Sequence, residues 1–143
     1  MAVVNQLSAL PVPGGDVVLK NYGGTDIAAG YGVLFDGTNK GDAQNPPGIV
    51  LPTASGGVAK TCGVTLETIK AGGTGRVRMM GGAVAAVANA TLTPGALVQI
   101  SDVTAHLGEI IAAASTNEIL GKALSDAVAG DPILVWVMPT SHN

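Results

Sequence analysis

The stretch Gly63–Met80, GVTLETIKAGGTGRVRMM, returns as Gly121–Met138, GKALSDAVAGDPILVWVM, at a constant offset of 58 positions. In both copies a Gly opens a short segment, Ala-Gly closes it, and an apolar run follows. The residues that are identical at this offset are Gly63/Gly121, Leu66/Leu124, Ala71/Ala129, Gly72/Gly130, Val77/Val135 and Met80/Met138. Repetition of this kind indicates small β units that bury their apolar faces against each other.

The repeat extends upstream. Gly30–Phe35 (GYGVLF) matches Gly95–Ile100 (GALVQI) at an offset of 65, so the first copy is longer between the matched blocks. The surplus falls in 36–52, whose Gly and Pro residues predict a long loop. The repeat units are then 25–82 and 91–138, each built as strand, loop, strand, Gly turn and strand. The alternative is a coincidental match in a chain rich in Ala, Gly and Val.

Composition predicts one compact all-β domain, residues 16–143, that follows an arm of residues 1–15. The 143 residues include 21 Gly and 8 Pro, which favours short strands and turns over long helices. The apolar fraction is 47% but the aromatic fraction only 3%. We therefore expect an aliphatic core with Trp136 as its single large anchor, on a buried final strand, Pro132–Met138.

Alternating and apolar runs between Gly or Pro turns predict the strands. Ala83–Ala90 and Ile110–Ala114 are Ala-rich and helical by propensity, but both are short and close to Gly turns, so strands are favoured, the first over Ala83–Ala88. Val58–Ile69 and Gly75–Met80 are expected to form a hairpin. The other expected strands are Asp16–Asn21, Ala28–Asp36, Gly48–Leu51, Ala96–Ser101, Glu109–Ala114, Ile119–Ala123 and Pro132–Met138.

Charge and cysteine content exclude several classes of function. The net charge is −3 and 12% of residues are charged, so no basic stripe exists for nucleic acid. The longest apolar stretch, Met79–Ala88, is far shorter than the roughly 20 residues of a membrane-spanning helix. A single cysteine, Cys62, excludes a disulfide framework and fits synthesis in a reducing cytoplasm. Low charge with many apolar residues favours assembly into an oligomer or larger particle.

The sequence carries no recognisable catalytic, cofactor-binding or metal-binding set, so we expect neither an enzyme nor a cofactor. His142 is next to the chain end and His106 lies in a polar turn, so no triad can be assembled around either. Gly73–Arg78 begins like a dinucleotide fingerprint but has Arg78 in place of the last Gly. The acidic residues are dispersed, without the spacing of a calcium loop or a catalytic carboxylate pair.

Arg76 and Arg78 are candidate interface residues. Alternate residues of a strand share a face, so both guanidinium groups should project together, with Val77 on the core side. They belong either to a solvated face near Glu67 or to an interface, where Arg is enriched. In the second copy the position of Arg78 is taken by Trp136, as expected if the two copies face different neighbours.

The N-terminal arm is a second candidate contact region. It precedes a Pro-Val-Pro-Gly-Gly hinge, Pro11–Gly15. Such an arm either stays loose or self-packed, or adds as an extended segment to the sheet edge of a neighbour. Its candidate contact residues are Ala2, Val3, Val4, Asn5, Leu7 and Leu10.

The order of these motifs resembles the small capsid decoration, or cement, proteins of tailed bacteriophages. The resemblance covers roughly residues 16–138 and rests on Gly placements, repeated Gly-Val pairs and the Ala129-Gly-Asp131 pattern before Val135. It implies a β-tulip-like fold, as in the head-stabilising protein of phage lambda. It also implies a homotrimer bound to the major capsid protein on the outer surface of the expanded head. The family supplies no catalytic residues, and its N-terminal arms often add to strands of the capsid shell.

Two other functions compete with a decoration role. A head-fibre base or tail structural protein belongs to the same structural class. A small-ligand or carbohydrate-binding β domain belongs to another class and would need aromatic platforms, for which one Trp and two Tyr are few. An enzyme is the least favoured class.

Overall fold

The structure is a computed structural model that describes residues 15–56, 58–114 and 117–140. Within these ranges every element of regular secondary structure is a strand, so the expected all-β class is confirmed. All pairs between these strands are antiparallel. The strands are β1 (Asp16–Lys20), β2 (Gly32–Phe35), β3 (Ile49–Val50), β4 (Thr61–Thr65), β5 (Thr74–Arg78), β6 (Ala83–Val87), β7 (Leu97–Ile100), β8 (Ile110–Ala112), β9 (Ile119–Ala123) and β10 (Pro132–Thr140).

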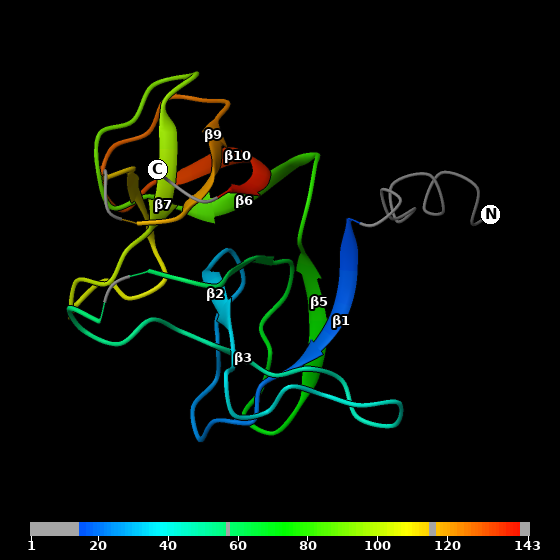
Figure 1. Cartoon of the computed structure of the whole chain (residues 1–143). Coiled ribbons are helices and arrows are strands. Elements are labelled where there is room, and N and C mark those ends of the chain that lie inside the picture. Colours follow the sequence, from blue (N-terminus) through cyan, green and yellow to red (C-terminus); the bar gives the residue numbers. More distant parts are fainter. Residues whose placement is uncertain (1–14, 57, 115–116, 141–143) are drawn as a thin grey trace.

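The strands form two five-stranded sheets, one for each half of the chain. The first sheet has the order β1-β5-β4-β2-β3 and the second has the order β6-β10-β9-β7-β8. Figure 1 shows the first sheet in the lower part of the molecule and the second in the upper part, joined by the link from β5 to β6. The expected hairpin is present as β4 and β5, although β4 is confined to residues 61–65.

The two sheets are equivalent strand for strand. β4 maps onto β9, and β5 onto the first part of β10, at the offset of 58; β2 maps onto β7 at the offset of 65. The register extends the match, because Asp16 lies opposite Arg78 while Ala83 lies opposite Trp136. β1 and β6 are therefore equivalent as well, so the structural repeat starts before residues 25 and 91. Their sequences, DVVLK and AVAAV, are too different for the match to be visible without the fold.

Backbone geometry explains why glycines recur in the two copies. A Cβ atom on Gly63 would collide with the carbonyl oxygen of Arg78, and one on Gly121 with that of Trp136. Gly72 and Gly130 have φ values of +74° and +93°, a conformation that side-chain-bearing residues rarely adopt. The glycines recur in the sequence because each copy has one place where two strands lie very close together and one turn with a positive φ.

Each half has its own apolar core. The first core contains Leu19, Ile27, Val33, Ile49, Cys62, Ile69 and Val77. The equivalent second-half positions, Ala86, Leu92, Val98, Ile110, Leu120, Ala127 and Val135, belong to one larger cluster. That cluster also takes in Val64 and Val58 of the first half, with Leu34 and Leu66 packed against it. The two halves of the molecule therefore pack against each other through apolar side chains.

The expectation that Trp136 anchors the core is wrong. Burial alternates along β10, so the strand is not buried throughout. Val135 and Val137 are fully buried, whereas Trp136 is 45% exposed on the opposite face. Side-chain size favours a buried tryptophan, but the two-residue period of the strand decides which face each residue occupies.

Candidate interaction surface

The described residues provide no reactive cluster. No group of three or more His, Cys, Asp and Glu that could hold a metal ion occurs within the described ranges. His106 Nδ1 lies 2.8 Å from Glu109 Oε2, in the turn between β7 and β8. Cys62 is buried, and burial raises the pKa of its thiol to about 12, which keeps it protonated and unreactive. In the part of the chain that the structure describes, no helix is long and apolar enough to cross a membrane.

The cleft along β6 does not supply a catalytic site either. It has a volume of about 380 Å³ and opens to solvent between the two halves of the molecule. Arg78 is the one charged side chain among its lining residues, which otherwise come mostly from the small side chains of 83–87 and 29–30. A single engaged guanidinium among alanines and valines gives no acid, base or nucleophile to a bound molecule.

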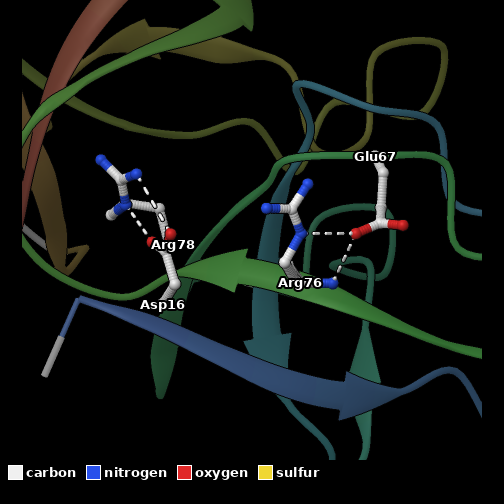
Figure 2. Close-up of polar contacts among 4 residues, drawn as sticks. All are labelled: Asp16, Glu67, Arg76 and Arg78. Carbon is white, nitrogen blue, oxygen red and sulfur yellow. Dashed lines mark hydrogen bonds and ion pairs between the residues drawn. The ribbon is translucent and has the colours of Figure 1, made fainter. Parts of the chain in front are cut away.

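Arg78 is occupied inside the molecule. Its Nε donates a hydrogen bond to Asp16 Oδ1, and its Nη2 donates to Asp16 Oδ2 at 3.2 Å (Figure 2). The side chains are only 15% and 10% exposed, so this paired contact ties the edge strand β1 to β5 in a partly desolvated place. A further bond from Nη1 to the Gly81 carbonyl, at 3.4 Å, reaches the link to β6. Arg78 therefore joins three segments of its own chain.

Arg76 has a different environment on the same face of β5. Figure 2 shows both guanidinium groups on the same side of the strand, as the alternation predicts. Arg76 Nε donates to Glu67 Oε2 at 3.0 Å, and the Arg76 backbone N–H donates to the same oxygen at 3.1 Å. The Arg76 side chain and its backbone N–H lower the pKa of the Glu67 carboxyl. Both side chains are about half exposed, so this pair lies at the solvated surface.

A feature that sequence reasoning missed is the outer face of the second sheet. It carries exposed apolar side chains where the first sheet carries Arg76 and Arg78, because Leu134 and Trp136 occupy the equivalent positions. Ala83 and Ala85 lie opposite them on β6, so the face stays flat and apolar toward that edge. The signal was the alternation in PILVWVM, which places every second residue away from the core. The exposed apolar residues of this face are Leu97, Leu124, Leu134, Trp136 and Met138.

The candidate residues of the N-terminal arm, Ala2, Val3, Val4, Asn5, Leu7 and Leu10, lie outside the described residues. The described chain begins at Gly15, whose carbonyl accepts a hydrogen bond from the Met79 N–H. The described chain therefore begins beside the end of β5. Its role as a contact segment stays a prediction.

Comparison with known proteins shows a likeness at the level of the fold. The chain is similar to the N base of head fiber gp8.5 in bacteriophage phi29, with a TM-score of 0.59 and 13% sequence identity. The two chains share a fold. The match covers 89% of this chain and 98% of that chain. No family model and no curated protein sequence matches. Because the identity is so low, the likeness establishes the shared fold alone.

Proposed function

We propose that this chain is a structural protein of a bacteriophage virion, bound to the outer surface of the head. The observation that carries the proposal is the fold likeness to the phi29 head-fiber base, which spans nearly the whole of both chains. The surface chemistry is compatible with it, because the described residues offer apolar and ion-paired surfaces and no reactive cluster. Such a protein works by occupying a lattice of equivalent sites, where many weak contacts add up.

Two roles on the head are open to such a protein. As a decoration protein it would bind the major capsid protein of the expanded head as a homotrimer and stabilise the shell by bridging capsomers. As a head-fibre base it would attach other virion parts to the head, and the fold likeness to the base of a phi29 head fiber favours this second role. In either role residues 1–10 would contact the capsid as an extended arm, and exposed Arg76 would lie at the rim of the contact.

The test is co-sedimentation of the purified protein with undecorated expanded heads of its phage, with unexpanded proheads as the control. Saturable binding to expanded heads is the expected result, and no binding to either particle would refute the proposal. Heat resistance of the loaded heads separates the roles, because a cement protein raises the temperature at which heads release DNA and a fibre base leaves it unchanged. A variant without residues 1–10 should keep its melting temperature and bind more weakly. Equal binding would refute the arm contact.

A further inference from the structure

The two halves of the molecule meet in a head-to-tail manner. The outer face of the first sheet covers the inner face of the second sheet. Leu34, Val64 and Leu66 of that outer face pack in the same cluster as Val84, Ile100 and Val137. Gly32 lies so close to Ile100 that a Cβ atom would come within 2.5 Å of its side chain.

Polar contacts hold the two halves in this arrangement. The Thr61 N–H donates to Glu118 Oε2 at 2.6 Å, and the Glu118 N–H donates to the Val58 carbonyl at 3.1 Å. The Val87 N–H donates to the Gly30 carbonyl at 3.1 Å. The contact is thus a specific one between two different surfaces of equivalent halves.

The first sheet has an equivalent inner face. In the described structure this face is less completely covered than the inner face of the second sheet. The positions equivalent to Val84 and Val137 are Val17 and Met79. Val84 is 4% exposed and Val137 is fully buried, whereas Val17 is 37% exposed and Met79 is half-buried. Phe35, the equivalent of the fully buried Ile100, is also half-buried. We call this set, Val17, Phe35 and Met79, the open end of the first half.

The second half has the matching outer face left uncovered. Leu97, Lys122 and Leu124 occupy the positions of Gly32, Val64 and Leu66, which the first half buries against the second. Leu97 and Leu124 are 41% and 44% exposed, and Lys122 is exposed too. Together with Leu134 and Trp136 they form an apolar surface with one cation, which we call the free face. A surface of this kind is characteristic of a protein interface.

We propose that the free face binds the open end of the first half of a second copy of this chain. The contact would use the surfaces equivalent to those that join the two halves within one copy. Because Leu97 and Lys122 replace Gly32 and Val64, the two sheets would lie farther apart than within one copy. Each copy contributes its free face to one neighbour and its open end to another, so the interface is heterologous. Every free face and every open end is covered only when the copies close into a ring. The occupant is a second copy because the open end lies at the same positions in the first half as the inner face of the second sheet in the second half. Within one copy, that inner face of the second sheet already packs against an outer sheet face.

This inference deepens the self-association included in the proposed function, and its test needs no capsid. The mass of the full chain in solution is measured by analytical ultracentrifugation over a range of concentrations. The wild type is expected as a closed oligomer, and Leu124→Glu as a single chain with an unchanged melting temperature. Leu124 is exposed, and its first-half equivalent, Leu66, packs against the second half. The control is Val128→Glu, which should stay oligomeric. Val128 is exposed and apolar, but its first-half equivalent, Lys70, lies at the surface, away from the contact between the halves.

A cysteine pair tests the geometry even if Leu124→Glu fails to fold. Val17→Cys and Leu124→Cys proteins are mixed and oxidised, because the equivalent residues, Val84 and Leu66, belong to the contact between the halves. Buried Cys62 contributes little background. Disulfide-linked dimers in the mixture, and few in either protein alone, are the expected result. A monomeric wild type, or Leu124→Cys dimers that form without the Val17→Cys protein, would overturn the inference. A monomer that still binds heads would refute this inference alone, whereas an intact oligomer that binds no heads would refute only the proposed function.

Discussion

Adding one methyl group at Gly121 should destabilise the whole domain, because this glycine sets the spacing between β9 and β10. A Cβ atom there would overlap the Trp136 carbonyl oxygen, and it would lie 2.9 Å from the carbonyl carbon and 3.1 Å from the Met138 nitrogen. Ordinary contacts of a Cβ atom lie at 3.4–4 Å. The neighbouring atoms are backbone and cannot rotate away, so β9 must move away from β10 and lengthen the hydrogen bonds between them.

The size of the effect follows from two contributions. Overpacking costs about 1–3 kcal/mol, and each ladder hydrogen bond that is lost costs about 1 kcal/mol. We expect Gly121→Ala to lower the free energy of unfolding by at least about 3 kcal/mol. For a chain of this size, that corresponds to a fall in melting temperature of roughly 10 °C. Urea unfolding followed by Trp136 fluorescence, together with a thermal melt by circular dichroism, measures both quantities.

Two further glycines make the prediction specific. Gly63→Ala should cost a similar amount, because its Cβ atom would meet the Arg78 carbonyl oxygen at the equivalent place. Gly24→Ala is the control, since no atom lies within 4 Å of the added group and its φ is not positive. It should be neutral or slightly stabilising, by up to about 1 kcal/mol, because alanine restricts the unfolded chain. Equal stability of all three variants would refute the argument from close approach.

Three other predictions concern the core, the thiol and pH. Trp136→Ala should cost no more than about half of the 3–5 kcal/mol expected for a buried Trp, whereas fully buried Leu120→Ala should cost about 2–5 kcal/mol. Urea unfolding of both variants is followed by circular dichroism, because Trp136→Ala removes the single tryptophan; a larger loss for Trp136→Ala than for Leu120→Ala would contradict the exposed position of Trp136. Cys62 should react with iodoacetamide only in denaturant, as mass spectrometry would show, and fast labelling of the native protein would contradict its burial and raised pKa. The pKa values of Asp26 and Glu67 are lowered in the fold, so their stabilisation is present above the unfolded pKa values near 3.8 and 4.5 and is lost as pH falls through the folded values. The urea concentration at the midpoint of unfolding should therefore decrease when the pH is lowered below about 4.5, and it should decrease less in Asp26→Asn. A midpoint concentration that increases on acidification would contradict this sign.

The sequence predicted those parts of the fold that depend on backbone geometry. Gly63 and Gly121 recur because strands approach closely there, and Gly72 and Gly130 recur because their φ values are positive. Such requirements allow almost no other residue, so they remain readable in one sequence. The equivalence of β1 and β6 was not readable, because a half-exposed edge strand accepts both DVVLK and AVAAV.

Surface features were harder to predict. The alternation placed Arg76 and Arg78 on one face, but their partners were set by tertiary structure. Asp16 is 62 positions from Arg78, and only the β1–β5 register brings the two together. The position of Trp136 was misjudged because size was weighed above alternation. The exposed apolar face around Trp136 could have been found by treating PILVWVM as a strand with two different sides.

One pair of positions illustrates how the divergence of the two copies changes the surface. Asp16 opposite Arg78 in the first sheet corresponds to Ala83 opposite Trp136 in the second. A paired carboxylate and guanidinium, nearly shielded from solvent, satisfies its own hydrogen bonds, so that surface gains little from a further partner. A tryptophan beside an alanine has no polar group to satisfy except its indole N–H, and it gains free energy from any apolar surface that covers it. The same backbone therefore carries one face whose polar groups are satisfied within the chain and one that would gain free energy from an apolar neighbour. Two unlike faces favour the head-to-tail contact between copies that we propose, because a heterologous interface joins two different surfaces, whereas a two-fold dimer joins a surface to itself.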